Sequence, residues 1–492
     1  MTDTFFQTGH GRVFLQKFGA GPGRNMSYMG RASLGGFSKS DGDVTPARNP
    51  SPHAYDQFED VAEVRGEEGR PTTSLKGRFG LENEIISMVC PFHIQAHYGQ
   101  CADPQDANGG WEKILAYDHC YFTARSSDDL TALDSGERAM IMLTGEITAR
   151  KMWEVNQMNL GEVADAEVTR EVADVMVADY ISCGDCGYES DGDQRIFAVA
   201  SGPGAESPTI SPILLQSSDG GTTWATYDIT TMTDTDAPTA VAISGGRAIV
   251  TVNDTPGVHV ADLNALDTWM VSTAVFATGV NDIYSPSGAH AWMVGDGGYI
   301  WFSSRPANEA IVQESGSTTS ENLLAIHGVD NRNLVAVGEN GAILVTTNGG
   351  RTWQTSPTAP ALVGDIHTVW MRTAYTWLIG DDDGNLFYTT NAGGSWHALD
   401  FPLSGEGRIS DIAFAHYVDS PFGFLVANDA TGKGYIFRTL DGGDTWYQLP
   451  DFANLTPTNV GLNAVAAGLS ANFCVAGGLK ELAGDGIIII GS

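Results

Sequence analysis

The chain has 492 residues, 42% of them hydrophobic and 17% charged, a composition that favours a folded protein of two or three domains. Its 26 Lys and Arg against 60 Asp and Glu leave a formal net charge of −34, which argues against a protein that grips nucleic-acid phosphates. Gly occurs 59 times, a turn-rich composition typical of many short strands. The longest obvious apolar run, residues 487–490, has only the length of a strand, and the N-terminus lacks the basic start of a secretory signal. We therefore expect neither a membrane span nor a membrane partner.

Basic residues are concentrated at the start of the chain. Residues 1–50 contain six Lys and Arg against three Asp and Glu, whereas residues 191–492 contain ten against 31. An extended basic arm at the N-terminus could dock onto an acidic neighbouring subunit. A flexible chain end is equally compatible with this composition.

The segment after the arm predicts a β-rich domain. Residues 53–75 have the pattern of a strand, a tight charged turn and a second strand. Residues 79–90 carry apolar residues at helical spacing. Residues 138–160 indicate two strands joined at Gly145 or Ala149.

Six cysteines include two groups whose spacing a metal could use. The groups are Cys90, His93, His97 and Cys101, with Cys120 beyond them, and Cys183 with Cys186. The second group lacks a matching Cys-x-x-Cys partner, and the two His residues fit a strand as well as a shared helical face. We therefore expect inert or disulfide-forming thiols, no bound metal and no cofactor.

The C-terminal 300 residues contain an internal repeat: an apolar strand, a Gly-Asp or Gly-Glu turn, a second strand and a turn that ends in Trp. The repeated tryptophans are Trp224, Trp269, Trp353, Trp396 and Trp446, separated by 45, 84 (two periods of 42), 43 and 50 residues. A period of about 40–50 residues with several short strands is typical of β-propeller blades. With the degenerate copies we count seven units. The last unit lacks an outer strand, and we expect residues 176–181 to supply it and close the ring.

The Trp-bearing turns share the pattern Ser/Thr-x-Asp/Asn-x-Gly-x-Thr/Ser-Trp. The Asp or Asn can accept backbone N–H groups of its own turn, the Gly takes a positive φ, and the Trp buries its indole against the adjacent blade. The residues that we assign to this structural role are Ser217, Asp219, Gly221, Trp224, Asn348, Gly350, Trp353, Asn391, Trp396, Asp441, Gly443 and Trp446.

These turns resemble the Asp boxes, or BNR repeats, of sialidases and of photosystem II assembly factor-like propellers. The resemblance covers about residues 190–492. The sequence of the repeat is more similar to that of the assembly-factor group than to that of the sialidases. In the families that carry them, Asp boxes are structural and remote from catalytic centres, so the resemblance indicates fold and not chemistry. It also implies a central channel, which we expect residues 322–326 and 365–369 to line, with His327 and His367 nearby.

Resemblance to sialidases implies an arginine triad that clamps a substrate carboxylate, a Tyr/Glu pair and an acid/base Asp. The nearest match to the sialidase Phe-Arg-Ile-Pro signature, residues 194–197, lacks the proline. The Asp-rich residues 381–384 lie where other repeats have a turn, which favours a solvated turn over a calcium loop. We expect a non-catalytic protein, with a sialidase-like glycoside hydrolase as a lesser alternative.

An arm, a small β-sandwich and one packed helix resemble the layout of bacteriophage tail-tube subunits. That resemblance implies a virion tail protein, made in the host cytoplasm, that self-assembles into a homo-oligomeric ring or tube. Its propeller would face outward to other structural proteins, a glycan or a protein, and DNA would pass through the lumen without specific binding. The alternative is a cytoplasmic propeller adaptor or assembly factor that binds a protein partner.

The predicted organisation is therefore mostly β. It comprises an extended basic arm at residues 1–50, a β-sandwich-like assembly domain with one helix at residues 51–181, and a seven-bladed Asp-box β-propeller at residues 182–492.

Overall fold

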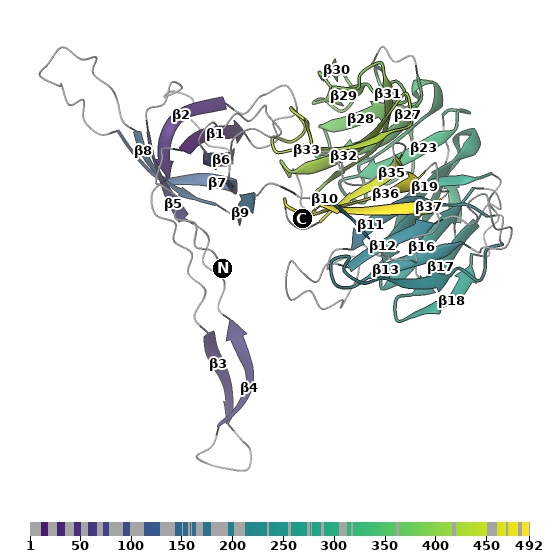
Figure 1. Cartoon of the computed structure of the whole chain (residues 1–492), viewed down its shortest axis with the longest axis horizontal. Helices are drawn as coiled ribbons and strands as arrows, with labels where there is room; N and C mark the ends of the chain where they lie inside the picture. The colour runs from purple at the N-terminus through teal and green to yellow at the C-terminus, as the bar shows by residue number, and fades with distance from the viewer. Residues whose placement is uncertain are drawn as a thin grey trace, which may run out of the picture. The chain divides into compact units, whose positions relative to one another are not determined.

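The computed structural model of the chain consists almost entirely of β-strands and divides into two compact units, with the boundary between Asn156 and Gln157 (Figure 1). This boundary precedes residue 182, where the repeat predicts the propeller to begin. The predicted mostly-β fold class is confirmed.

The structure describes the following residues: 11–17, 27–34, 44–50, 58–65, 72–77, 92–98, 113–127, 143–149, 151–155, 158, 160–163, 171–178, 195–200, 212–233, 236–253, 257–272, 276, 278–286, 290–304, 312–315, 318–360, 364–415, 420–449, 460–468, 471–480 and 485–491.

The first unit is built on one antiparallel sheet and one separate strand pair. Its strands are β1 (Gly11–Lys17), β2 (Ser27–Leu34), β3 (Val44–Pro50), β4 (Phe58–Arg65), β5 (Thr72–Gly77), β6 (Phe92–Tyr98), β7 (Lys113–Ser127), β8 (Leu143–Thr148) and β9 (Lys151–Val155). The sheet order is β6-β1-β2-β5-β8-β7-β9, and β6 also pairs with β7. This additional pairing closes six of the strands into a circuit, where the sequence predicts a sandwich. Strands β3 and β4 pair only with each other among the described strands.

Several expectations for this unit need correction. Residues 11–17 and 27–34 form strands β1 and β2 inside the sheet, where the sequence predicts an extended basic arm. Strands β4 and β5 both form, but they do not pair with each other: β4 pairs with β3, and β5 pairs with β2 and β8. Local patterning identifies strands but not their partners. Of the two predicted junctions, Ala149 is confirmed, because β8 ends and β9 begins on either side of it. The predicted helix at residues 79–90 lies outside the described residues.

The described residues of the second unit form 28 strands and two short 3₁₀ turns. Its elements are β10 (Leu160–Glu162), β11 (Val172–Ala178), β12 (Arg195–Ala200), β13 (Ile213–Ser217), β14 (Ala225–Asp228), β15 (Pro238–Ser244), β16 (Arg247–Val252), β17 (Gly257–Asp262), β18 (Ala265–Val271), β19 (Val280–Tyr284), β20 (Ala291–Gly295), η1 (Asp296–Gly298), β21 (Ile300–Ser303), β22 (Val312–Ser315), β23 (Leu323–Gly328), β24 (Leu334–Gly338), η2 (Glu339–Gly341), β25 (Ile343–Thr346), β26 (Gln354–Thr355), β27 (Ile366–Met371), β28 (Trp377–Asp381), β29 (Leu386–Thr389), β30 (His397–Ala398), β31 (Gly407–Phe414), β32 (Gly423–Asp429), β33 (Gly434–Thr439), β34 (Tyr447–Gln448), β35 (Val460–Ala467), β36 (Cys474–Lys480) and β37 (Asp485–Gly491).

These strands form seven four-stranded antiparallel sheets arranged as the blades of a propeller (Figure 1). The innermost strands are β11, β15, β19, β23, β27, β31 and β35, and each contacts the next around the ring. Strand β35 contacts β11, so the ring is closed. The predicted seven-bladed propeller is confirmed.

The ring is closed by a strand that the sequence does not reveal. Strand β10 pairs antiparallel with β37 and supplies the outermost strand of the last blade, with Leu160 opposite Gly491. The N–H of Val163 extends this pairing by donating to the carbonyl of Ile488 at 2.9 Å. The prediction that residues 176–181 would do this is wrong, because Met176 belongs to β11, the innermost strand of the first blade. An edge strand of three residues, Leu-Gly-Glu, is too short to show an alternating pattern.

The core of the propeller lies between adjacent blades. One apolar cluster, for example, joins Trp292 of β20 and Ile300 of β21 to Leu334 of β24 and Leu344 of β25. Every blade therefore depends on its neighbours to bury its faces, which makes the closed ring one structural unit.

Candidate functional site

The four Asp-box turns lie at the outside of the propeller and share one hydrogen-bond network. They connect the third strand of a blade to the outermost one, as between β25 and β26. In that turn, the Oδ1 atom of Asn348 accepts the backbone N–H of Thr352 at 3.1 Å and the hydroxyl of Thr346 at 2.9 Å. The Thr346 hydroxyl oxygen also accepts the N–H of Gly350 at 3.0 Å. The side chains thus replace water as partners of the turn's backbone.

The other three turns repeat these bonds at the same spacing. The N–H of Thr223 donates to Asp219 at 2.9 Å, that of Ser395 to Asn391 at 2.8 Å and that of Thr445 to Asp441 at 3.0 Å. The hydroxyl partners are Ser217, Thr389 and Thr439. The glycines of the four turns have φ values of 92°, 79°, 78° and 96°, which L side chains adopt only with strain. The residues that we assigned to the Asp boxes included Ser217 but not Thr346, Thr389, Thr439 and Gly393, which occupy the equivalent positions of the same sequence pattern.

The indoles of these turns differ in burial. Trp353 is 3% exposed and Trp446 8% exposed, whereas Trp224 and Trp396 are half-buried. Trp224 and Trp446 donate their Nε1–H to a carbonyl of their own turn, and Trp396 donates to the carbonyl of Thr358 at 3.0 Å. All four pack within clusters that span two blades, so their role is structural.

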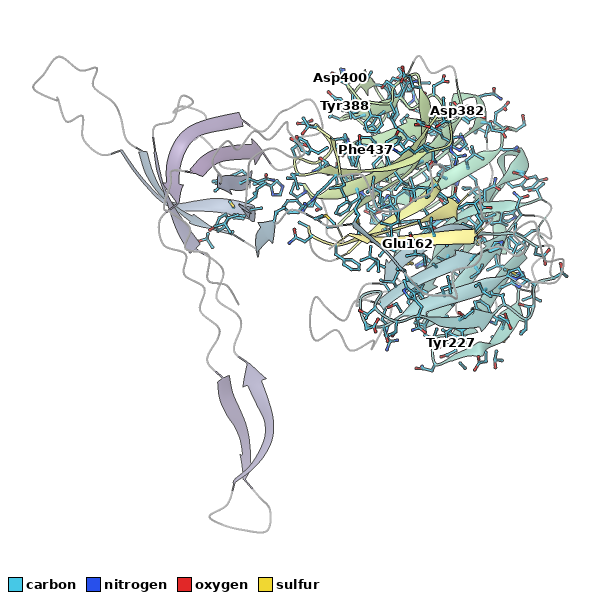
Figure 2. All side chains as sticks on the ribbon, viewed as in Figure 1. Glu162, Tyr227, Asp382, Tyr388, Asp400 and Phe437 are labelled. Carbon is cyan, nitrogen blue, oxygen red and sulfur yellow. The ribbon has the colours of Figure 1, made fainter. Side chains whose placement is uncertain are left out.

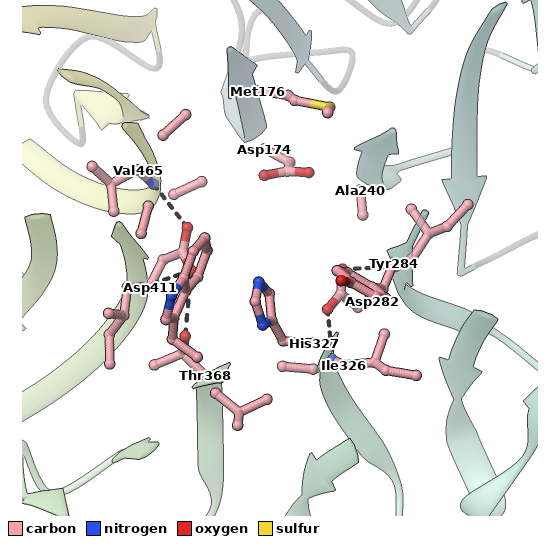
Figure 3. Close-up of a pocket in the computed structure, with 18 of the residues that line it drawn as sticks. Asp174, Met176, Ala240, Asp282, Tyr284, Ile326, His327, Thr368, Asp411 and Val465 are labelled. Carbon is pink, nitrogen blue, oxygen red and sulfur yellow. Dashed lines mark hydrogen bonds between the residues drawn. The ribbon is translucent and has the colours of Figure 1, made fainter. Parts of the chain in front are cut away.

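The central channel of the propeller contains a cavity with a volume of about 540 Å³. All seven innermost strands contribute to its lining (Figure 3). Each of these strands carries an irregularity at the same place, where its pairing with the second strand skips one residue. Such bulges redirect the neighbouring side chains. The residues that follow the seven irregularities, in blade order, are Asp174, Ala240, Asp282, Ala325, Thr368, Asp411 and Ala464.

The three carboxyl groups at these positions connect neighbouring blades. Asp282 accepts the N–H of Ile283 in its own strand and the N–H of Ile326 in the next blade, both at 2.7 Å. Asp174 bridges in the same way to Val241 at 2.8 Å.

Asp411 bridges to Val465 at 2.9 Å and also accepts the Thr368 hydroxyl at 3.3 Å. In each case the bridged strand carries Ala at the equivalent position, so the carboxyl group has room to reach across. All the hydrogen-bond donors that these three groups use are neutral.

Burial makes the carboxyl groups weak acids. It raises the pKa of Asp174 to about 6 and that of Asp411 to about 7, against the lowering effect of the backbone hydrogen bonds. The pKa of Asp282 is raised well above its usual range by burial, and the charges of Asp174 and Asp411 raise it further. The three groups therefore share one electrostatic environment across the channel (Figure 3).

An aromatic arc lies two residues further along three consecutive inner strands. It consists of Tyr284, His327 and Trp370, with ring centroids 5.0 Å apart for the first pair and 4.0 Å apart for the second. The Nδ1 atom of His327 accepts the N–H of Met371 at 3.1 Å, and burial lowers the pKa of His327 to about 3, so this imidazole is neutral. The equivalent positions of the other four blades carry Met176, Ala242, Ala413 and Ala466. Three of these four side chains are small, and the fourth is the flexible Met176.

One rim of the channel is acidic. There Asp365, just before β27, accepts the N–H of Asn340 at 2.9 Å and donates its own N–H to Asp382 at 2.9 Å. Glu339, on the neighbouring turn, accepts the amide of Asn322 at 3.0 Å. All three carboxylates retain exposure to solvent. Arg408 of β31 lies close enough to this rim to interact with the charge of Asp382. Burial lowers the pKa of the Arg408 guanidinium, and the negative charges of Asp382 and Glu171 oppose this effect.

Several sequence predictions can now be placed. His327 and His367 both line the channel, as expected for residues beside the innermost strands β23 and β27. Residues 381–384 form a turn in which Asp381 accepts the N–H groups of Asp383 and Asn385.

The proposed metal ligands are only partly described. His93 and His97 both lie on strand β6, and the His93 side chain is buried. Cys90, Cys101, Cys183 and Cys186 lie outside the described residues. Within the described ranges, no three His, Cys, Asp or Glu side chains group as metal ligands, and Cys120 and Cys474 are buried and form no disulfide.

Our sequence analysis missed the three channel carboxylates and, of the arc, Tyr284 and Trp370. A signal was present: Asp followed by Val or Ile occurs at 174, 282 and 411, which are two and three blades apart. No helix among the described residues is long and apolar enough to cross a membrane.

Comparison with known proteins supports the propeller. Residues 265–389 match the family model of the photosynthesis system II assembly factor YCF48. The chain is similar to the solved structure of YCF48 bound to D1 peptide, with 14% identity over 68% of this chain and 95% of that one, at a TM-score of 0.50.

Similarity extends to other propellers. The RRP9 WD40 repeats share 13% identity over 68% of this chain and 97% of that one, with a TM-score of 0.50. YCF48 from Cyanidioschyzon merolae shares 15% identity over 67% of this chain and 98% of that one, with a TM-score of 0.49. No curated protein matches the sequence. The resemblance to BNR-repeat propellers is therefore confirmed. These similarities show the fold of the chain and not its function.

Proposed function

We propose that this protein is a non-catalytic, protein-binding propeller of the adaptor or assembly-factor kind, which receives a segment of its partner in the central channel. The observation that carries this proposal is the cavity of about 540 Å³ framed by all seven inner strands. Concave sites with a mixed apolar and polar lining are where proteins usually bind ligands. The match to the YCF48 family model supports the same reading, and one of the similar structures is that of YCF48 with a bound peptide.

The channel side chains also suit binding better than catalysis. Its carboxyl groups bridge backbone N–H groups of neighbouring blades, and His327 is held by the N–H of Met371. Groups held in this way orient the walls of a site. The sialidase-like alternative stays a prediction, because the matches described above concern the fold alone.

The tail-tube role stays a prediction drawn from the N-terminal layout. The family match lies within the propeller, and the structural matches are to propellers. We therefore place protein binding first.

Peptide selection on the full chain tests the proposal. Twelve-residue peptides enriched from a random display library should bind the wild-type protein, and Ala325→Met, which partly fills the channel, should weaken them about tenfold. The matched control is Ala398→Met on the exposed strand β30. Failure to enrich any peptide, or equal loss in both variants, would overturn channel binding. Melting temperatures of the two variants show whether each is folded.

A further inference from the structure

The charge and aromatic character of the channel say what kind of partner segment it fits. Three carboxyl groups line the cavity, their hydrogen-bond donors are neutral, and an aromatic arc lies beside them (Figure 3). All three Asp residues are half-buried and line the channel. Buried carboxylates without a cationic partner are costly, so this environment favours a ligand that brings positive charge.

The aromatic arc strengthens this preference. The faces of Tyr and Trp rings attract cations, and the attraction increases when water is excluded. Because His327 is neutral and lies between Tyr284 and Trp370, it adds a π-system and no opposing charge. Three of the four other equivalent positions carry Ala (Ala242, Ala413 and Ala466), and these small side chains leave space for a side chain of the length of Lys or Arg.

The rim favours the same ligand. Glu339, Asp365 and Asp382 lie together on two neighbouring blades beside this rim, with Asp382 labelled in Figure 2, and the whole chain carries a net charge of −34. Such a field attracts a basic segment from solution and repels an acidic one.

We propose that the channel is a receptor for a single Lys or Arg side chain of a basic partner segment, held between the carboxyl groups of Asp174, Asp282 and Asp411 and the rings of Tyr284 and Trp370. This inference rests on the proposed function, because it names the chemistry of the segment that enters the channel. The occupant is a peptide cation rather than a metal ion, since the lining combines carboxyl groups with aromatic faces.

Binding of a cation should release protons. The positive charge favours the ionised carboxyl groups, so it lowers the pKa values of Asp174 and Asp411 from about 6 and about 7. The other titratable or charged groups of the lining are Tyr284, His327, His367 and Arg372. Affinity for a basic peptide should therefore rise from pH 5.5 to pH 7.5.

The test uses the peptides selected on the full chain. Their single most enriched residue should be Lys or Arg, and its replacement by norleucine or citrulline should reduce affinity at least about tenfold in titration calorimetry. Titrations at pH 6.5 in two buffers of different ionisation enthalpy should show net proton release. Both measurements use the wild-type protein and do not depend on the folding of a variant.

Substitutions of channel residues test whether the basic peptide binds there. Asp282→Asn and Trp370→Leu should each weaken the basic peptide, whereas Asp400→Asn, which removes an exposed carboxylate elsewhere, should not. Selected peptides that bind in the channel and tolerate the neutral replacement would overturn this inference and leave the proposed function standing. Absence of any channel-dependent peptide would overturn both.

Discussion

Single residues in this propeller act mainly by satisfying backbone groups. Asp219 and Asp441 hold turns on the outside, and Asp174, Asp282 and Asp411 hold neighbouring blades together on the inside. The same side-chain type therefore serves two structural tasks. Only the inner three face a cavity, and this position makes them available to a ligand.

Trp353 tests the contribution of a buried Asp-box indole. Trp353→Ala should lower the free energy of unfolding by about 3–5 kcal/mol, because it leaves a cavity between two blades. Trp396→Ala, in an equivalent turn but half-buried, should cost clearly less. Urea titration of both variants checks this ranking, and equal losses would contradict it.

A substitution at Asp411 tests whether the pKa of a channel carboxyl group is raised. Its pKa of about 7 in the folded protein exceeds the value of about 3.9 for an unfolded Asp, so the folded state binds more protons between these values. This group therefore favours folding at low pH, and that contribution is lost as the pH rises through 7.

His327 has the opposite effect on the pH dependence of stability, because its pKa of about 3 in the folded protein lies below the usual 6.5. Substitution of Asp411 separates the contribution of its carboxyl group from that of His327. Asp411→Asn should be less stable than the wild type at pH 5, and the difference should narrow towards pH 8. Melting temperatures across this range measure the difference, and a gap that widens with pH would contradict the assignment.

At the scale of elements, the blades are regular but their closure depends on a strand from before the repeat. Strand β10 has only three residues, yet it joins the last blade to the segment that leads into β11. Closure of the ring leaves no blade without a partner on either side.

Substitutions at Val163 test how much the pairing of β10 with β37 contributes to the closed ring. Val163→Pro removes the N–H that donates to Ile488 and should destabilise the protein by about 1–3 kcal/mol relative to Val163→Ala, which keeps the donor. Denaturant titration of the two variants measures the backbone contribution alone. Equal stabilities would show that the β10 pairing contributes nothing to the ring.

At the scale of the whole molecule, the two units pose different questions. The propeller is a closed ring with a channel, and the first unit is a closed antiparallel sheet. Binding of a peptide in the channel requires one copy of the chain, whereas a tail tube requires many.

Solution mass separates these readings. Light scattering that gives 52.2 kDa would contradict the predicted homo-oligomeric ring or tube for the isolated chain and agree with an adaptor. Rings or stacked tubes in electron micrographs would restore the tail-tube prediction to first place.

The sequence by itself determined the type of fold, because its information is local and periodic. A Trp-bearing turn every 40–50 residues specifies hairpins and their number, and Asp, Gly and Trp each have a reason to occur there. The same local reasoning identified strands β4 and β5, and it placed His327 and His367 near the innermost strands.

Only the tertiary structure decided which segments meet. The pairing of β10 with β37 joins residues more than 300 positions apart, and no local pattern encodes such a choice. The channel has the same origin: Asp174, Asp282 and Asp411 stand on separate blades, and their shared electrostatic environment exists because the ring closes. Side chains acquire their pKa values and their neighbours from burial, which is a property of the assembled ring rather than of any one repeat.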